Sequence, residues 1–323
     1  MIAVLCGGVG AAKMLAGLQA VVDPGEIVAV VNTGDDTELH GLYVSPDLDT
    51  ITYTLAGAVN PATGWGLTDE SFHALQALER YGAITWFRLG DSDLATHLYR
   101  TGRMREGATL SVVTAEIARA WGLSVRLLPM SDDPVRTWLG LADQREVAFQ
   151  EYFVKLRHSV VVAAVRFEGA AQARPAPGVL EALGSAQIIV VAPSNPIVSI
   201  GPILAVPGVA EVLRARRDMV VAVSPIVAGA ALKGPAARLL VELGGEASAP
   251  GVARFLSSFV GTLVIDEADA DRAAEVELAG VHCVVAPTVM GSPELAARLA
   301  RAVLRAGGIG AGSSGSATTG PEA

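Results

Sequence analysis

Short apolar runs that end at glycine or polar residues recur along the chain. The first two runs, residues 2–6 and 27–31, are rich in valine and isoleucine, and each is followed by a glycine-containing turn. This pattern is typical of buried strands in a parallel sheet. Between the two runs, residues 11–22 place four apolar side chains on one face of a helix, namely Met14, Leu15, Leu18 and Val21. The opening segment therefore predicts a strand, a glycine turn, a helix and a second strand.

The alternation of apolar and amphipathic segments continues along the chain. We expect further strands at residues 125–128, 188–191, 219–223, 263–265 and 281–285. We expect helices at residues 50–59, 69–80, 110–121, 179–183 and 293–305, and a short helix that begins at Ser92 or Asp93. Strands that alternate with helices predict an α/β fold, here a Rossmann-like, doubly wound and mainly parallel sheet.

A middle segment departs from this alternation. Residues 146–154 and 160–166 have strand patterns separated by a short polar stretch, so a small β-rich insertion is expected at 135–174. The α/β nucleotide-binding core would then comprise residues 1–134 and 175–305. Residues 306–323 have almost no large apolar side chain, and we expect a flexible tail there.

The composition indicates a soluble enzyme with ample core. The 323 residues are 51% hydrophobic, and no apolar stretch approaches the ~20 residues that a membrane helix needs. A net charge of −9 argues against broad binding to nucleic acid or anionic membranes, because both need a positive surface. Cys6 and Cys283 lie within apolar runs, as buried free thiols in a reducing compartment do. We therefore expect a cytoplasmic protein.

The turn after the first apolar run carries candidate phosphate-binding groups. Gly7, Gly8 and Gly10 let main-chain amides approach a phosphate, and the following helix adds the positive end of its dipole. Lys13 supplies a formal charge. The spacing resembles a dinucleotide fingerprint, although Lys13 replaces the third small residue, and it fails as a P-loop because Met14 stands where Ser or Thr is required. A tight structural connection is the other interpretation of this turn.

Four carboxylates follow the second apolar run, namely Asp35, Asp36, Asp47 and Asp49. Both turns should lie at the carboxyl edge of a parallel sheet, where open α/β folds bind ligands. This much negative charge beside a phosphate site predicts a divalent cation, Mg²⁺, between the two. Asp47 and Asp49 alone are more simply explained as a solvated loop pair, and the neighbouring Asp35 and Asp36 shift the balance toward a metal site.

Other residues are weaker candidates for chemistry. His97, on a predicted helix after Gly90 and Asp91, either contacts a ligand or is an ordinary polar helix residue. Trp65, in a glycine-rich loop, either stacks on a planar ligand or anchors the loop. No cluster of histidine and cysteine has zinc spacing, and no serine or cysteine lies in a recognisable nucleophile elbow.

A series of motifs follows the predicted strand ends in chain order. They are Cys6-Gly7-Gly8-Val9-Gly10, Val31-Asn32-Thr33-Gly34-Asp35-Asp36, Ser45-Pro46-Asp47-Leu48-Asp49-Thr50, Leu89-Gly90-Asp91-x-Asp93-x-Ala95-Thr96-His97, Leu128-Pro129-Met130-Ser131-Asp132-Asp133-Pro134, Pro193-Ser194-Asn195-Pro196 with Ser199-Ile200-Gly201-Pro202, and Ala222-Val223-Ser224-Pro225-Ile226. From the first residue to about residue 290, this series resembles the CofD/FbiA family, the phospholactate or phosphoenolpyruvate transferases of coenzyme F-420 biosynthesis.

The resemblance implies a magnesium-dependent transferase whose donor is a guanosine-diphosphate-activated three-carbon acid. The ribityl hydroxyl of the deazaflavin Fo attacks the phosphorus that bears the acid, and GMP leaves. The Ala-, Gly-, Val- and Arg-rich composition is similar to that of actinobacterial members, which use enolpyruvyl-2-diphospho-5'-guanosine and make dehydro coenzyme F-420-0. The alternative donor is the lactyl compound that archaeal members use. The family is dimeric, so the resemblance implies a homodimer.

The resemblance also implies roles for individual residues. Asp36 and Asp49 hold Mg²⁺ or assist deprotonation of the acceptor hydroxyl. Fo binds near Asp49 and Arg88, with Asp91 and His97 in the same loop and helix. The contacts implied for the diphosphate and the guanosine come from Gly7, Gly8, Gly10, Lys13, Asn32, Ser194, Asn195 and Ser224.

Two other classes of protein share part of this pattern. A sister family of sugar-nucleotide-binding regulatory proteins has the glycine turn and the Asn-Thr-Gly-Asp-Asp type of loop, which would make the chain a binding module without turnover. A nicotinamide-dependent oxidoreductase accounts for the glycine turn and one acid, but leaves residues 45–50 and 128–134 without a role. A different ligand should stabilise the native state of each class: GDP for the transferase, a UDP-sugar for the regulatory protein and NAD(H) for the oxidoreductase.

Overall fold

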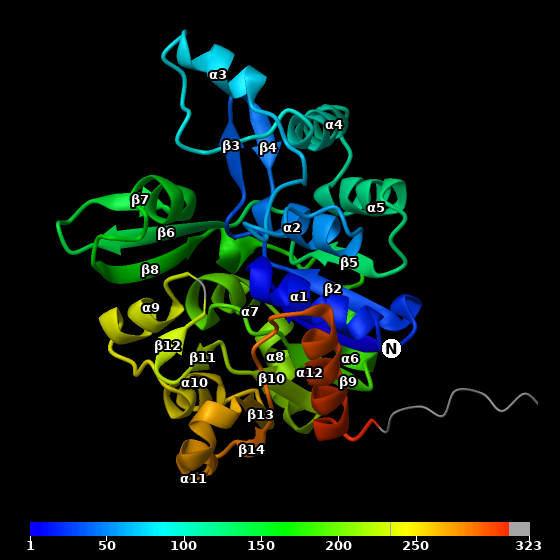
Figure 1. The fold of residues 1–323 in the computed structure, drawn as a ribbon, viewed down its shortest axis with the longest axis vertical. Coiled ribbons are helices and arrows are strands. Elements are labelled where there is room, and N and C mark those ends of the chain that lie inside the picture. Colours follow the sequence, from blue (N-terminus) through cyan, green and yellow to red (C-terminus); the bar gives the residue numbers. More distant parts are fainter. Residues whose placement is uncertain (233, 310–323) are drawn as a thin grey trace, which may run out of the picture.

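The computed structural model describes residues 1–232 and 234–309, and a seven-stranded parallel sheet forms its centre (Figure 1). The strands in spatial order are β14 (His282–Val285), β13 (Thr262–Ile265), β10 (Val220–Val223), β9 (Ile188–Val191), β1 (Ile2–Cys6), β2 (Ile27–Val31) and β5 (Arg126–Pro129). The chain leaves β1 toward β2 and β5, and then returns to β9 on the other side of β1. The topological switch point therefore lies between β1 and β9, where open sheets of this kind bind their ligands.

The central strands are apolar because both faces of the sheet are covered. Successive side chains of a strand point to opposite faces. In β1, Val4 and Cys6 belong to the hydrophobic cluster on one face, whereas Ala3 and Leu5 belong to the cluster on the other. Burial of one large aliphatic side chain contributes about 1.5–3 kcal/mol, so these short runs stabilise the sheet strongly for their length.

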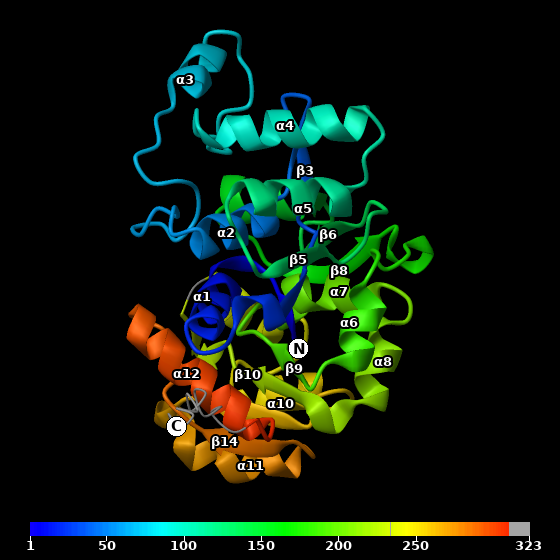
Figure 2. The ribbon, with the colours of Figure 1, turned by 90° about the vertical axis from the view of Figure 1, so that its right-hand side faces the viewer.

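Helices cover both faces of the sheet (Figure 2). One face carries α1 (Gly8–Gln19), α2 (Pro46–Leu55), α5 (Leu110–Ala120) and α12 (Pro293–Ala306). The other carries α6 (Val179–Ser185), α7 (Gly201–Ala205), α8 (Val209–Ala215), α9 (Ala236–Glu242), α10 (Ala249–Leu256) and α11 (Ala273–Leu278). Among the described residues, no single helix is long and apolar enough to cross a membrane, and one pair bent by 97°, Pro196–Ala205 with Val209–Ala215, reaches that length only jointly.

Smaller elements extend from this core. The hairpin of β3 (Thr37–Leu39) and β4 (Leu42–Val44), together with α3 (His73–Glu79) and α4 (Asp93–Arg105), forms the arm at the top of Figure 1. A second, three-stranded antiparallel sheet consists of β7 (Glu146–Ala148), β6 (Arg136–Leu141) and β8 (Val162–Glu168). The short strands β11 (Ile226–Val227) and β12 (Ala230–Ala231) pair after β10. The arm and the three-stranded sheet both reach the candidate site described below.

The predicted fold class is confirmed, including the parallel sheet and the small β-rich insertion. Each predicted strand of the central sheet agrees with the structure within one residue at either end. The helix predicted at residues 50–59 is wrong in its bounds, because α2 spans Pro46–Leu55. The helix predicted from Asp69 begins only at His73, and Asp69 has a φ of 52°, outside the helical region.

The structure tests the expected division of the chain into core, insertion and tail only in part. The three-stranded sheet lies within the expected insertion 135–174, whose boundaries stay a prediction, as do those of the core segments 1–134 and 175–305. Of the expected flexible tail 306–323, Ala306 is the last residue of α12, and residues 310–323 lie outside the described part of the chain.

Candidate functional site

The glycine turn lies at the switch point of the sheet and is bonded to the strand across it. Gly7 follows β1, and Ser194 follows the neighbouring β9. The Ser194 hydroxyl accepts a hydrogen bond from the Gly7 amide at 3.2 Å and donates one to the Gly7 carbonyl at 2.9 Å. A Cβ at Gly7 would lie 2.7 Å from Oδ2 of Asp47, and one at Gly10 would lie 2.5 Å from the Pro193 carbonyl oxygen. Only glycine fits such close approaches of the backbone.

Asp47 joins the glycine turn to the loop after β2. Its Oδ1 accepts from the amide of Gly8 at 2.8 Å, and its Oδ2 accepts from Nδ2 of Asn32 at 3.0 Å. Oδ1 of Asn32 in turn accepts from the amide of Gly34 at 2.8 Å. Gly8 has a φ of 75°, which turns its amide toward this carboxylate and which side chains other than glycine rarely adopt. Gly8, Asn32, Gly34 and Asp47 thus form one hydrogen-bonded unit.

The acidic segment after β4 is a helix terminus, not a loop. Asp47 and Asp49 lie in the first turn of α2, with Pro46 at its first position. Proline is favoured there because its missing N–H is not needed, and carboxylates are stabilised by the positive end of the helix dipole. The explanation of Asp47 and Asp49 as a solvated loop pair is therefore wrong, and all four carboxylates are buried.

Burial without full pairing raises the pKa of three of these acids. Desolvation raises the pKa of Asp36 to about 7, against the hydrogen bond from the Ser45 hydroxyl and the charges of Arg100 and Arg136. Desolvation likewise raises the pKa of Asp47 to about 6 and that of Asp35 well above its usual range. Oδ1 of Asp35 and Oδ1 of Asp36 have no hydrogen-bond partner among the described residues. Buried, unpartnered carboxylate oxygens fit a cation.

Asp49 is paired with charged groups that come from α4 in the arm. Arg100 contacts both carboxylate oxygens of Asp49, and Nδ1 of His97 lies 3.7 Å from Oδ2 of Asp49. Nε2 of His97 lies 3.2 Å from Oδ2 of Asp93, and Oδ1 of Asp93 accepts a hydrogen bond from the hydroxyl of Tyr53 at 2.6 Å. Although burial opposes it, the bonds from His97 and Tyr53 hold the pKa of Asp93 below its ordinary value.

This second cluster offers another position for a cation. One ligand atom each from Asp49, Asp93 and His97 lies within 4.8 Å of the other two. Asp93 and His97 belong to one motif of the sequence, and Arg100 lies outside that motif, although the spacing of four and three residues places all three on one face of a helix. Of the three, only His97 had been singled out. It is almost fully buried, so it is part of the site and not a surface residue.

The three-stranded insertion also contributes to the site. The amide of Thr137 donates to the carbonyl of Gly34 at 2.8 Å, and Nε2 of Gln150 donates to the carbonyl of Asp35 at 3.1 Å. Arg136, the first residue of β6, places its guanidinium carbon 5.7 Å from the ring centroid of Tyr43. The sequence analysis missed Arg100, Arg136, Tyr43 and Gln150, because nothing local in the sequence connects them to the carboxylates.

Several predicted contact residues have other partners in this structure. Lys13 donates to the main-chain carbonyl of Met290 at 3.1 Å. Arg88 is exposed on the arm, where its guanidinium carbon lies 4.2 Å from the ring centroid of Phe72. Asp91 accepts from the hydroxyl of Ser71 and from the amides that open α3, which lowers its pKa to about 2. Its carboxylate therefore orders the arm.

Asn195 and Ser224, the last two candidate residues along the chain, each stabilise a main-chain turn at the carboxyl edge of the sheet. Oδ1 of Asn195 accepts from the amides of Ile197 and Val198, while its Nδ2 is buried without a hydrogen-bond partner among the described residues. The hydroxyl of Ser224 donates to the carbonyl of Ile226 at 2.8 Å. Both residues follow strands on the β9 side of the switch point, but the Ser224 hydroxyl is committed to its own turn. The free Asn195 amide group is the better placed donor for a ligand.

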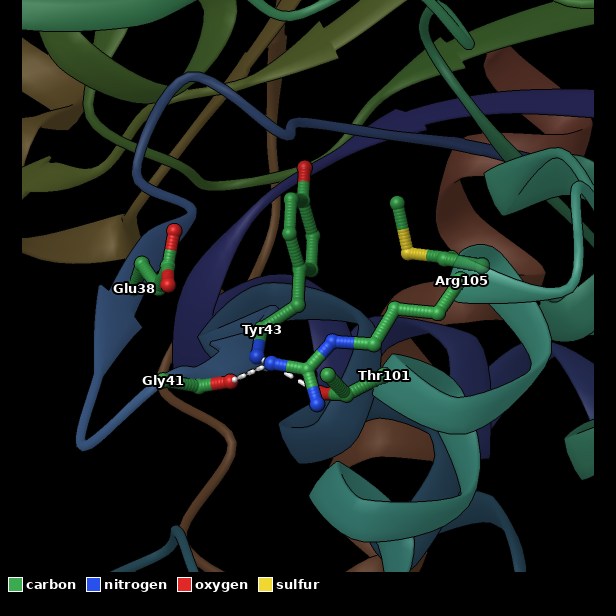
Figure 3. A pocket seen from close by; sticks show the side chains of 6 residues that line it. Glu38, Gly41, Tyr43, Thr101 and Arg105 are labelled. Carbon is green, nitrogen blue, oxygen red and sulfur yellow. Dashed lines mark hydrogen bonds between the residues drawn. The ribbon is translucent and has the colours of Figure 1, made fainter.

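A cavity of about 210 Å³ lies beside this site, in the arm. It is lined by Glu38, Gly41, Tyr43, Thr101, Met104 and Arg105 (Figure 3). Figure 3 shows the hydroxyl of Tyr43 pointing away from Gly41 and Arg105, whose side chain donates to the Gly41 carbonyl at 2.9 Å. None of Asp35, Asp36, Asp47 and Asp49 lines this cavity, although Tyr43 on its wall hydrogen-bonds Asp36, so the cavity is not the glycine-turn site itself.

Comparisons with known proteins give a matching family model and similar proteins with names. A family model described as 2-phospho-L-lactate transferase CofD matches residues 2–285. The chain is 46% identical over 308 residues to a protein of Streptomyces griseus named phosphoenolpyruvate transferase, a match that covers 94% of this chain and 97% of that protein. It is 40% identical over 323 residues to a protein of the same name from Mycolicibacterium smegmatis, covering 95% and 99%.

A likeness to solved structures supports the fold alone. A member of the UPF0052 family from Bacillus halodurans superimposes with a TM-score of 0.63, at 16% sequence identity, over 94% of this chain and 98% of that one. At this level of identity, the shared architecture does not extend to a shared activity.

Proposed function

The chain belongs to the 2-phospho-L-lactate transferase CofD family, and we propose that it is a phosphoenolpyruvate transferase. In this reaction, enolpyruvyl-2-diphospho-5'-guanosine donates its phosphoenolpyruvyl group to the ribityl hydroxyl of the deazaflavin Fo, giving dehydro coenzyme F-420-0 and GMP. The observation that carries the proposal is the 40% to 46% identity, along nearly the whole chain, to proteins named phosphoenolpyruvate transferase. Transfer of 2-phospho-L-lactate from the lactyl donor, after which the family is named, is the second candidate.

The proposed reaction exchanges one phosphorus–oxygen bond for another. The ribityl oxygen forms a bond to the phosphorus that bears the enolpyruvyl group, and the bond from that phosphorus to the bridging oxygen of the diphosphate breaks. GMP leaves with the bridging oxygen, and the hydroxyl proton passes to a base. The site must therefore hold a diphosphate, offset its charge and accept a proton near the acceptor hydroxyl.

The buried carboxylates fit a divalent cation, and we assign Mg²⁺ to them. The unpartnered oxygens of Asp35 and Asp36 supply the hard donors that Mg²⁺ prefers. Asp36 and Asp49 would hold it, with Asp35 and Asp47 beside them. When bound, Mg²⁺ would offset the negative charge of the transferring phosphoryl group.

The glycine turn and its partners would bind the guanosine diphosphate half of the donor. Ser194 bonds to the backbone of Gly7, and Asp47 accepts from the main-chain amide of Gly8 and the side-chain amide of Asn32. The turn is therefore ordered before the nucleotide binds. Such preorganisation lowers the entropy that binding must overcome. The unpartnered Nδ2 of Asn195 would donate to the guanosine.

The acceptor half would lie between α2 and the arm. In its alternative role, Asp36 would take the acceptor proton instead of holding Mg²⁺: in the metal-free site burial brings its pKa to about 7, which suits a group that takes a proton at neutral pH. Arg100 orients the carboxylate of Asp49, and His97 connects it to Asp93. We assign Arg88 to the ribityl chain of Fo because a guanidinium donates to hydroxyls in a planar fork. We further propose that the enzyme is a cytoplasmic homodimer.

Incubation of the purified protein with Fo, Mg²⁺ and each of the two donors, followed by mass spectrometry, tests the proposal. The expected product is dehydro coenzyme F-420-0 from the enolpyruvyl donor, with GMP released in equal amount and no product without Mg²⁺. Thermal unfolding with GDP, a UDP-sugar or NAD(H) gives an independent readout, since a ligand of the native state raises the melting temperature. Product from the lactyl donor alone would favour the second candidate, and stabilisation only by a UDP-sugar or by NAD(H) would contradict both.

A further inference from the structure

Arg136 is the one arginine that the β-rich insertion places at the carboxylate cluster. It opens β6, and the next residue, Thr137, is hydrogen-bonded through its amide to the carbonyl of Gly34. The position of Arg136 is therefore fixed relative to the loop that carries Asp35 and Asp36. Its positive charge lowers the pKa of the Asp36 carboxyl, and its guanidinium carbon lies 5.7 Å from the ring centroid of Tyr43.

The guanidinium of Arg136 has no carboxylate partner among the described residues, although it hydrogen-bonds the side chain of Tyr43. It donates to the main-chain carbonyl of Val135 at 3.3 Å and forms no ion pair with any residue in the described part of the chain. Its cross-strand neighbour Glu168 is engaged elsewhere, since Glu168 accepts from Nε1 of Trp138 at 2.8 Å and pairs with Arg166 at 3.5 Å. A guanidinium has five N–H donors, so most of those of Arg136 remain available to a ligand.

The two other positively charged side chains considered for this site, Arg100 and Lys13, already have partners in the protein. Arg100 is fully buried and bound to the carboxylate of Asp49, and Lys13 donates to the carbonyl of Met290. The proposed donor carries a carboxylate on its three-carbon acid in addition to its phosphates. The protein acids at positions 35, 36, 47 and 49 would repel that carboxylate, so a cation has to face it in addition to the Mg²⁺ that we assign to the phosphoryl group.

We propose that Arg136 binds the carboxylate of the three-carbon acid of the donor and thereby distinguishes the donor from GDP. This inference rests on the proposed function and deepens it, because it assigns recognition of the acid to the insertion and that of the nucleotide to the glycine turn. The planar fork of a guanidinium matches a carboxylate with two parallel hydrogen bonds. The ring of Tyr43 limits the orientations that the fork can take.

The chain offers a matched control on the same three-stranded sheet. Arg166 on β8 places its guanidinium carbon 5.4 Å from the ring centroid of Trp138, an arrangement like that of Arg136 on Tyr43. Arg166 is exposed and is paired with Glu146 at 2.6 Å. Truncation of Arg166 thus removes the same kind of side chain from the same sheet without affecting the site.

Calorimetry with GDP and with enolpyruvyl-2-diphospho-5'-guanosine, both in the presence of Mg²⁺, tests the assignment. Arg136→Ala should weaken binding of the enolpyruvyl donor by at least ~10-fold, as expected for loss of a charged bidentate hydrogen bond, and change GDP binding by less than ~3-fold. Arg136→Lys should recover part of the loss, because it keeps the charge but not the fork. Arg166→Ala should change neither affinity.

A donor whose carboxylate is blocked as a methyl ester gives a second measurement that needs no variant. The wild-type protein should bind this ester more weakly than the donor, and Arg136→Ala should bind the two equally. Equal weakening of GDP and donor in Arg136→Ala, or equal binding of ester and donor by the wild type, would overturn the assignment. Wild-type protein that prefers the donor over GDP but transfers nothing to Fo would instead contradict the proposed function and leave the assignment standing.

Discussion

The guanidinium of Arg100 contacts both carboxylate oxygens of Asp49, and the two side chains are only 2% and 5% exposed. One partner opens α2 and the other lies in the middle of α4, so the ion pair joins the core to the arm. Truncation of one partner of a buried pair leaves an uncompensated charge, which costs about 3–5 kcal/mol. Asp49 therefore stabilises the site as well as taking part in its proposed chemistry.

We expect Asp49→Asn to lower turnover by at least ~100-fold, because it removes a charge that the metal and the transition state need. The free energy of unfolding should fall by about 3–5 kcal/mol, because Arg100 loses its partner. Steady-state kinetics over a range of Mg²⁺ concentrations and urea unfolding measure the two effects. Near-normal turnover at limiting Mg²⁺ would contradict the assignment of Asp49.

The double variant Asp49→Asn/Arg100→Met separates stability from catalysis. It replaces both members of the pair, so it should recover part of the lost free energy of unfolding. Its turnover should remain as low as that of Asp49→Asn. Recovery of turnover together with stability would show that Asp49 acts only through the fold.

We expect Gly8→Val to lose GDP binding while the protein still folds. The φ of 75° at Gly8 strains a branched residue by roughly 1–2 kcal/mol, and the displaced amide would release Asp47. Gly122→Val is a matched control, because Gly122 has a φ of 70° and open space around it at the end of α5. Calorimetry should show unchanged GDP affinity for Gly122→Val, and the same result for a folded Gly8→Val protein would refute the role of the turn.

The raised pKa of Asp36 predicts how stability depends on pH without metal. The folded-state pKa of about 7 exceeds the value of about 3.9 in the unfolded chain, so the folded state holds the proton more tightly. The contribution to stability is present below pH ~4 and is lost as the pH rises through 7. The stability of the wild type relative to Asp36→Asn should therefore fall between about pH 4 and pH 7 and change little above that.

Thermal unfolding of both proteins in metal-free buffer, at half-unit steps of pH, measures this difference. Saturating Mg²⁺ should remove most of the slope, because a bound cation keeps the carboxylate ionised. A difference that rises with pH in metal-free buffer would mean that Asp36 is paired in the folded state and not desolvated.

We expect Arg88→Ala to raise the apparent KM for Fo and to leave GDP binding largely intact. The residue is exposed on the arm and lies over Phe72, away from the bonded unit around the glycine turn. Loss of its donors to the ribityl chain should cost about tenfold in KM, as for one charged hydrogen bond. Arg80→Ala, which truncates an exposed arginine at the end of α3, is the control. Loss of GDP binding with an unchanged KM for Fo would place Arg88 in the nucleotide half.

The sequence by itself determined the central sheet. Runs such as residues 2–6 and 27–31 are short, rich in valine and isoleucine and apolar at every position, which is typical of a strand covered on both faces of a parallel sheet. The sequence also predicted the glycine turn, because glycines cluster directly after the first apolar run. The structure gives the reason for them, since only a residue without a Cβ lets the backbone lie so close to Asp47 and Pro193. Residues 7, 32 and 194 each follow a predicted strand, and the carboxyl ends of parallel strands share one edge of the sheet, so the sequence also predicted that these residues lie at the same edge.

The tertiary structure decided which groups face the carboxylates. Asp49 meets Arg100 across 51 positions of sequence, and Arg136 reaches the ring of Tyr43 from a separate sheet. The hairpin β3–β4 and the first turn of α2 were missed because Pro and Asp favour both loops and helix starts, and packing chooses between them. Burial, and with it the raised pKa of Asp36, depends on those long-range contacts, because desolvation comes from neighbours in space that no local pattern of the chain encodes.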